Sequence, residues 1–234
     1  MIVLQDLHKS FGDKQVLAGV NLQVGQGESL CVIGQSGTGK SVLLKCILGL
    51  VQPDRGGITW NGRPLDRAAF MAGFGMLFQG AALFDSMSVW QNVAFRLRQR
   101  MSDAKARAIA LDKLARVGLG AETADLMPAE LSGGMAKRVG LARAIADDPS
   151  VIFFDEPTTG LDPIRARAIN ALIRDIVTQT GATAITITHD MDSVRAIGDR
   201  VALLQGGRIV HDGPVAGMSD APELADFLGV GVAK

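Results

Sequence analysis

Short apolar runs separated by turn residues fill the first sixty positions of the chain, a pattern typical of β-strands. Similar runs return in the last third, where they alternate with a segment of helical spacing. This alternation predicts a largely parallel sheet packed against helices. The expected strands cover residues 2–4, 16–17, 20–22, 30–33, 58–60, 151–154, 182–188 and 201–204.

Helical spacing dominates the middle of the chain, from about residue 88 to residue 146. We therefore expect a helical lobe there, a long helix at 163–178 and a short surface helix at 221–228. The apolar positions that define the lobe are Val89, Val93 and Leu97 on one helix face and Ala108, Leu111, Leu114 and Ala115 on another.

The composition is that of a globular protein without a charge bias. Hydrophobic residues make up 47% of the 234 positions, and 24 Lys and Arg balance 24 Asp and Glu, which gives no electrostatic reason to bind nucleic acid. The sequence has no apolar stretch long enough for a membrane span and no signal peptide pattern at its start, so we expect a cytoplasmic protein. Cys31 and Cys46 are expected in the core and not in a disulfide.

Residues 34–41 carry the strongest chemical signal. They follow an apolar run, precede a helical pattern, and match the phosphate-binding pattern G-x-x-x-x-G-K-[ST]. The glycines allow a turn whose backbone N–H groups face phosphate oxygens, and the helix N-terminus adds partial positive charge. Lys40 is expected to reach the β- and γ-phosphates, and Ser41 to coordinate Mg²⁺. The residues expected to bind phosphate are Gly34, Gln35, Ser36, Gly37, Thr38, Gly39, Lys40 and Ser41.

A second glycine motif, at residues 131–135, distinguishes among the proteins that share such a loop. Ser132 is a good helix N-cap, and Gly133 and Gly134 leave N–H groups open at the helix start, so this is another anion site. Together with the acids that follow the apolar run at 151–154, the motif resembles the signature and Walker B motifs of ABC-type ATPases. The resemblance covers nearly the whole chain. It implies an α/β fold in a single domain of residues 1–234, with a P-loop, a RecA-like core, an antiparallel β lobe and a helical lobe.

The resemblance also implies roles in ATP hydrolysis. Asp155 ends an apolar strand, where a carboxylate can meet Mg²⁺. Glu156 corresponds to the residue that polarises the attacking water, and His189 to the histidine that contacts the γ-phosphate. Gln79 corresponds to the glutamine that links Mg²⁺ and the water to the transport subunit. The expected catalytic residues are Lys40, Gln79, Glu156 and His189, and the expected Mg²⁺ ligands are Ser41, Gln79 and Asp155.

Two more residues complete the implied ATP site. Phe11 stands where the family keeps an aromatic that stacks on adenine, although a core aromatic would give the same pattern. Asp162 lies in the loop that crosses the dimer contact and suits the N-cap of a helix that begins at Pro163. Ser132, Gly133, Gly134 and Asp162 are then expected to meet the ATP held by a second copy, in a head-to-tail homodimer that opens after hydrolysis.

Finer details resemble one branch of the family. Met135 stands where most members have Gln, and the segments 80–89 and 126–130 look like those of the ATPase subunit of MCE/Mla-type phospholipid transporters. The resemblance implies a membrane permease, a periplasmic MCE lipid-binding protein and, in some bacteria, a small STAS-like subunit as partners. It places the chain at the cytoplasmic face of the inner membrane. Leu83, Phe84 and Met87 are either contacts for the permease or part of the chain's own core.

Two alternatives stay open. The first is a transporter ATPase for another cargo, such as an amino acid or an ion, because the permease chooses most of the cargo. A soluble ABC ATPase without a transporter is the second alternative. A long tail that grips a second copy is not expected, since few residues follow Leu228.

Overall fold

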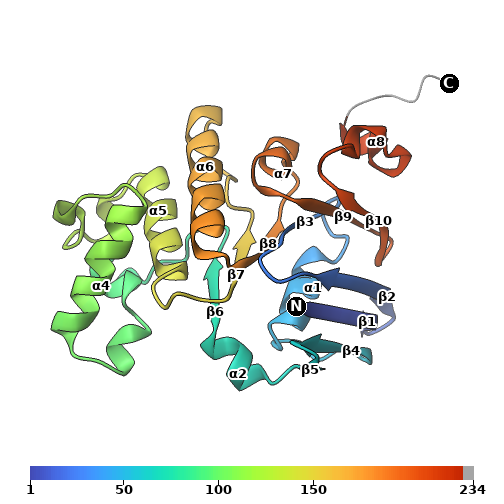
Figure 1. Ribbon diagram of the computed structural model, residues 1–234, viewed down its shortest axis with the longest axis horizontal. Helices are drawn as coiled ribbons and strands as arrows, with labels where there is room; N and C mark the ends of the chain where they lie inside the picture. Colours follow the sequence, from blue (N-terminus) through green and yellow to red (C-terminus); the bar gives the residue numbers. More distant parts are fainter. Residues whose placement is uncertain (229–234) are drawn as a thin grey trace. The chain divides into compact units, whose positions relative to one another are not determined.

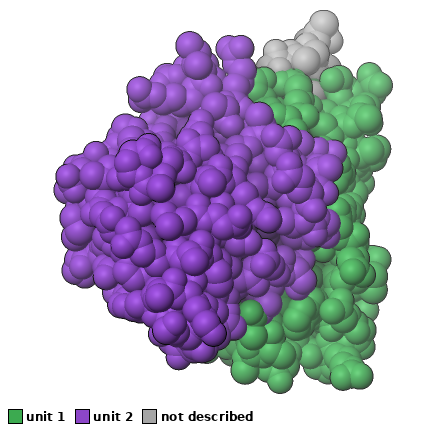
Figure 2. Space-filling model, turned by 60° about the vertical axis from the view of Figure 1, so that its left-hand side comes forward, with its two compact units in different colours: residues 1–72, 183–234 green, residues 73–182 purple. Residues whose placement is uncertain are grey.

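The computed structural model describes residues 1–228 and divides them into two compact units (Figure 2). The first unit comprises Met1–Ala72 and the chain from Thr183 onward, and the second comprises Gly73–Ala182. The helical segments expected between 88 and 146 all lie in the second unit. The tail beyond Leu228 lies outside the described residues. No helix within residues 1–228 is long and apolar enough to cross a membrane.

An antiparallel sheet forms one part of the first unit, as the sequence predicts for the N-terminal lobe. Apolar residues of its first strand are buried at Ile2, Leu4 and Leu7, and a bulge between Leu4 and Leu7 includes Asp6 with a φ of 47°. The bulge shifts the alternation by one residue and keeps Leu7 in the core. The strands, in the order β2-β1-β4-β5, are β1 (Ile2–Phe11), β2 (Lys14–Val24), β4 (Arg55–Trp60) and β5 (Arg63–Pro64) (Figure 1).

The second group of strands in the first unit is mostly parallel. Strand β3 pairs in parallel with both β8 and β9, and β10 pairs with β9 in antiparallel fashion. Every residue of β3 and of β8 is buried, as is typical of parallel strands covered on both faces. The strands are β3 (Ser29–Ile33), β8 (Thr183–Ile187), β9 (Arg200–Gln205) and β10 (Arg208–Pro214), and the helices of this unit are α1 (Lys40–Ile47), α2 (Arg67–Ala72), α7 (Met191–Ile197) and α8 (Ala225–Leu228).

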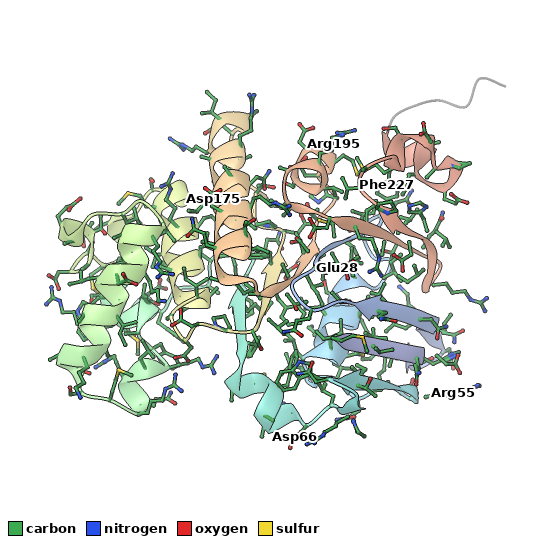
Figure 3. The ribbon with its side chains drawn as sticks, viewed as in Figure 1. Glu28, Arg55, Asp66, Asp175, Arg195 and Phe227 are labelled. Atoms are coloured by element: carbon green, nitrogen blue, oxygen red, sulfur yellow. The ribbon has the colours of Figure 1, made fainter. Side chains whose placement is uncertain are left out.

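An ion-pair network joins the ends of several strands of the first unit. The Arg200 guanidinium donates to Glu28 at 2.6 Å, to Asp212 at 2.5 Å and to the Gln23 carbonyl at 2.6 Å; Glu28 is labelled in Figure 3. Hydrogen bonds to the two carboxylates raise the pKa of Arg200 above its ordinary value. The network fixes the start of β9 against the turn that precedes β3.

The second unit consists of helices and two strands that pair in parallel. Strand β6 pairs with β7, with Leu77 opposite Phe154, so both strands end at the same edge. As predicted, Ser132 caps α5 and Asp162 caps α6. The elements are β6 (Phe74–Leu77), α3 (Val89–Val93), α4 (Asp103–Arg116), α5 (Gly133–Ala144), β7 (Val151–Asp155) and α6 (Pro163–Thr180), with 3₁₀ turns at Leu97–Gln99, Ala121–Thr123 and Pro128–Glu130.

The buried face of α4 differs from the predicted one. Ala108 and Ala115 are exposed, whereas Ala106, Ala110, Lys113 and Leu114 are buried. Alanine is a weak guide to burial because its side chain is small, and Lys113 is buried because its ammonium pairs with Asp148 at 2.5 Å. On the other face that the sequence predicts, Val89, Val93 and Leu97 are buried as expected.

Other boundaries shift by a few residues. Helix α5 ends at Ala144 and α6 extends to Thr180. The expected C-terminal helix is a 3₁₀ turn at Pro222–Leu224 followed by α8, and the elements α2, β6, α7 and β10 were not predicted. Cys31 and Cys46 are buried free thiols, which confirms that they belong to the core.

Candidate functional site

The loop after β3 is shaped by close backbone approaches. A Cβ atom on Gly34 would lie 2.5 Å from the carbonyl oxygen of Leu204, so a larger residue cannot occupy this position. Gly39, at the N-cap of α1, has a φ of 104°, a conformation that favours glycine. The sequence between them therefore folds into a tight turn that leads directly into α1.

The ammonium of Lys40 lies within this turn. Its Nζ donates to the carbonyl oxygens of Gly34 at 2.6 Å and Gln35 at 2.9 Å, and the Thr38 hydroxyl also donates to Gln35 at 2.9 Å. The positive charge is thus held beside the N-terminus of α1, whose N–H groups carry partial positive charge. This combination fits the phosphate chain of a nucleotide, and Ser41 follows in the first turn of α1.

His189 lies at the same edge of the sheet as this loop. Strands β3 and β8 are parallel neighbours, with Val32 opposite Ile187, so the loops after both strands begin at one edge. His189 is exposed, and the next residue, Asp190, caps α7 by accepting the N–H of Asp192 at 3.0 Å. The first unit therefore brings the phosphate-binding loop and His189 to the carboxyl ends of neighbouring strands, where open α/β sheets bind ligands.

Phe11 ends β1 with its ring 52% exposed, so it does not belong to the core. The ammonium of Lys9 lies 5.4 Å from the ring centroid. An exposed ring next to a cation can accept a flat, electron-rich base, and stacking on adenine remains the prediction for this residue.

In the second unit, Gln79 follows β6, Asp155 is the last residue of β7, and Glu156 comes directly after it. Because β6 and β7 are parallel, with Leu77 opposite Phe154, the three residues lie at or just beyond the same ends of the two strands. Glu156 has a φ of 48°, a conformation that a non-glycine residue rarely adopts. Its carboxylate accepts a hydrogen bond from the Thr159 hydroxyl at 3.0 Å. The backbone and the side chain of Glu156 are thus both constrained.

Lys137 was missed as a candidate from the sequence. Its side chain projects from α5, is 5% exposed, and donates from Nζ to the backbone carbonyls of Gln79 and Glu156. Burial lowers the pKa of Lys137, and the charges of Asp155 and Glu156 act in the opposite direction. One signal in the sequence was available: Lys137 lies four positions before Leu141, so both share one helix face, and Leu141 is fully buried.

Ser132 and Asp162 begin two neighbouring helices. The Ser132 hydroxyl accepts the N–H of Met135 at 3.3 Å, and a Cβ added to Gly133 would meet nothing within 4 Å. Asp162 accepts the N–H groups of Ile164 and Arg165, which lower the pKa of its carboxyl. A Cβ on Gly134 would lie 3.8 Å from Arg165, so the starts of α5 and α6 are close together.

The segment after Gln79 is tightly built by side chains that the sequence did not single out. Ala81 and Ala82 have φ values of 61° and 47°, and the Arg143 guanidinium donates to their carbonyls at 2.5 and 2.7 Å. Asn92, fully buried, binds both backbone groups of Phe84. Phe84 is nevertheless 42% exposed, and its ring packs on Phe95 with the centroids 4.6 Å apart. Residues 80–89, the segment after Gln79, therefore form a rigid loop with an aromatic ring on its surface.

The donor groups fit Mg²⁺ by their chemistry. Ser41 offers a hydroxyl, Gln79 an amide carbonyl and Asp155 a carboxylate, and Mg²⁺ prefers hard oxygen ligands. Ser41 belongs to the first unit, whereas Gln79 and Asp155 belong to the second. The predicted ATP-site residues are distributed over both units in the same way, with Phe11, the phosphate-binding loop and His189 in the first.

Comparison with known proteins identifies the family. The family model described as "ABC transporter" matches residues 17–159. A solved dimer of an ATP-binding cassette in a post-hydrolysis state, bound to ADP and Pi, is 30% identical to this chain. It superimposes with a TM-score of 0.82 and covers 92% of this chain and 99% of its own. The similar structure confirms the fold that the sequence predicts.

Curated relatives carry names with different cargoes. "Probable ribonucleotide transport ATP-binding protein mkl" of Mycobacterium bovis is 40% identical over 97% of this chain and 66% of its own length. "Methionine import ATP-binding protein MetN" of Mesorhizobium japonicum is 42% identical over 92% and 60%. "Protein TRIGALACTOSYLDIACYLGLYCEROL 3, chloroplastic" of Arabidopsis thaliana is 41% identical over 91% and 68%. The chain thus spans about two thirds of the length of these relatives.

Proposed function

The chain belongs to the ABC transporter family and is an ATPase domain that uses ATP with Mg²⁺, and on this premise we propose that it drives a transporter of phospholipids between bacterial membranes. The lipid cargo rests on the residues that resemble MCE/Mla-type ATPases, above all Met135 in the signature and the segment 80–89. The name of the relative from Arabidopsis thaliana refers to a galactolipid, which agrees with a lipid cargo.

In the proposed reaction, residues of this chain bind the triphosphate and handle one proton. Lys40 and the backbone N–H groups of its loop hold the β- and γ-phosphates, and His189 contacts the γ-phosphate. Glu156 accepts a proton from the attacking water, while the Thr159 hydroxyl keeps its carboxylate oriented. Ser41, Gln79 and Asp155 are the residues that would hold Mg²⁺, and the ion would neutralise negative charge on the phosphate oxygens.

The second anion site requires a second copy of the chain. Ser132 and the open N–H groups of Gly133 and Gly134 begin a helix that offers partial positive charge to a phosphate. We assign this surface to the γ-phosphate held by a partner copy, with Asp162 beside it. The working form is then a head-to-tail homodimer that closes on ATP and opens after hydrolysis.

The rigid segment after Gln79 is the proposed contact for the permease. Phe84 in this segment and Phe78 just before Gln79 are each 42% exposed, and large apolar side chains on a surface mark sites of interaction. Contact with a permease places the chain at the cytoplasmic face of the inner membrane. A periplasmic MCE protein and a STAS-like subunit are the further partners proposed for the complex.

Replacement of Glu156 tests the proposed reaction. Glu156→Gln should retain ATP binding, hydrolyse ATP at least about 100-fold more slowly, and accumulate as an ATP-bound dimer in gel filtration. Glu122→Gln, which changes an exposed glutamate of the same unit, is the control and should hydrolyse ATP normally. Near-normal turnover by Glu156→Gln refutes the assignment of the base.

Purification from membranes tests the proposed cargo. The full-length protein, expressed with its native membrane partners, should co-purify with a multispanning protein and with phospholipid that solvent extraction and mass spectrometry identify. Methionine import is the second candidate, because a relative with that name is 42% identical. Stimulation of the reconstituted ATPase by methionine and not by phospholipid would support that candidate, and an assembly without any membrane protein would favour a soluble ATPase.

A further inference from the structure

Lys137 is an unusual residue for the interior of its helix. It lies in the second turn of α5, and its side chain is buried between the loop that follows β6 and the turn that follows β7. Both hydrogen-bond acceptors of its ammonium are main-chain carbonyls, those of Gln79 and Glu156. The bonds therefore fix the path of the backbone at these positions and do not depend on their side chains.

A buried ammonium is expensive compared with an apolar side chain of the same size. Removing the charge from water costs free energy, and a methionine would fill a similar volume without that cost. Packing alone therefore does not account for a charged residue at this position, because an uncharged side chain would pack as well. What distinguishes lysine here is its reach to two carbonyls on separate segments, 58 and 19 positions away in the sequence.

The two segments that Lys137 joins have different tasks in the proposed reaction. One carries Gln79 and continues into the rigid segment with the exposed Phe84. The other carries Glu156, whose backbone has a φ of 48° and whose carboxylate is bonded to Thr159. A conformation of this kind is unfavourable for a non-glycine residue and persists where surrounding contacts hold it. The Lys137 bond to the Glu156 carbonyl is one such contact.

We propose that Lys137 is a positioning residue that ties the Gln79 loop to the backbone of Glu156, so that movement of that loop is transmitted to the general base. This inference rests on the proposed function, since it takes Glu156 as the base. Without the tie, Glu156 keeps its chemistry but loses its placement. Binding of ATP by the first unit then continues, whereas the hydrolytic step slows.

Lys137→Met removes both hydrogen bonds and preserves most of the volume. We expect kcat for ATP hydrolysis to fall about 10- to 100-fold with KM changed less than about threefold. Misplacing a catalytic group by about 1 Å has effects of this size. Lys137→Arg restores a charged donor and should recover at least part of kcat. Lys113→Met is the matched control: it also removes a buried lysine, 4% exposed, from the same unit, but one that pairs with Asp148.

Amide hydrogen exchange without nucleotide measures the tie independently of activity. Lys137→Met should speed exchange in residues 79–83 and 156–160 by about 10-fold or more, since a hydrogen bond to a charged donor is lost in each segment. Lys113→Met should leave these segments unchanged. If Lys137→Met does not fold, Lys137→Gln, which is too short to span both carbonyls, takes its place in both measurements.

The outcomes distinguish a failure of the Lys137 tie from a failure of Glu156 as the base. Normal kcat and unchanged exchange in Lys137→Met, with Glu156→Gln inactive, overturn the tie and leave the base assignment standing. Near-normal turnover by Glu156→Gln overturns the base assignment and this inference with it. A loss of kcat that Lys113→Met reproduces equally also overturns the tie, because it shows a general effect of losing a buried lysine.

Discussion

Asn92 offers the sharpest test of how the segment after Gln79 is built. Its side chain is fully buried, and its amide oxygen accepts the N–H of Phe84 at 2.7 Å. Its amide nitrogen donates to the carbonyls of Phe84, Met87 and Ser88 at 2.9 to 3.2 Å. One side chain thus closes the loop that carries the exposed Phe84, and Asn92→Ala removes all of these bonds at once.

The size of the effect follows from the number of bonds that the amide can make. It has one oxygen and two N–H groups in use, so about three hydrogen bonds are lost at roughly 1 kcal/mol each, or roughly 3 kcal/mol in the free energy of unfolding. For a chain of 150–250 residues, each kcal/mol lowers Tm by about 2–4 °C, so we expect a fall of about 6–12 °C. Thermal unfolding followed by circular dichroism measures it directly.

Asn92→Asp separates hydrogen bonding from packing. Aspartate has nearly the same shape but no N–H donors, and its carboxylate would face three carbonyl oxygens. We therefore expect Asn92→Asp to destabilise the protein at least as much as Asn92→Ala. Gln99→Ala, which removes an exposed amide nearby, should change stability by less than about 0.5 kcal/mol. A Tm for Asn92→Asp within about 2 °C of the unaltered protein would refute the reasoning, because volume alone would then account for the site.

Three other perturbations address other parts of the molecule. Ser132→Arg should lower ATPase activity at least about 10-fold by obstructing the partner's γ-phosphate while a single copy still binds ATP; unchanged activity would count against a shared site. Phe11→Ala should raise KM for ATP about 2- to 12-fold, the equivalent of one aromatic stacking contact, and Phe11→Trp should restore it; an unaltered KM in Phe11→Ala would contradict stacking. Burial raises the pKa of the Cys31 thiol to about 12, so iodoacetamide at pH 8 should spare Cys31 in the folded protein and modify it after denaturation. Rapid modification of the folded protein would disprove that burial.

The parts of the site that the sequence predicted depend on local backbone chemistry. Gly34 is required because the Leu204 carbonyl lies too close for a Cβ atom, and Gly39 because its φ is positive. Both lie within one loop of the chain. Ser132 and Asp162 cap the helices that begin one residue later, which short-range propensities favour. Sequence spacing is informative here because the interacting groups are only a few positions apart.

The parts that the sequence missed depend on long side chains that reach distant carbonyls. Lys137 bonds to Gln79 and Arg143 bonds to Ala81 and Ala82, all about sixty positions away. Backbone carbonyls exist at every position, so no residue pattern marks which one will serve as the acceptor. The misassigned face of α4 has a related cause, since the ion pair with Asp148 buries Lys113 on a helix whose alanines fit either face.

The left-handed backbone at Glu156 has a consequence for the evolution and engineering of this protein. Glycine adopts that geometry freely, so laboratory selection purely for resistance to heat would favour Glu156→Gly, which removes the carboxylate proposed as the general base. Thermal stability and ATPase activity thus favour different residues at position 156. Selections for thermostable variants need to include an activity requirement to retain the glutamate.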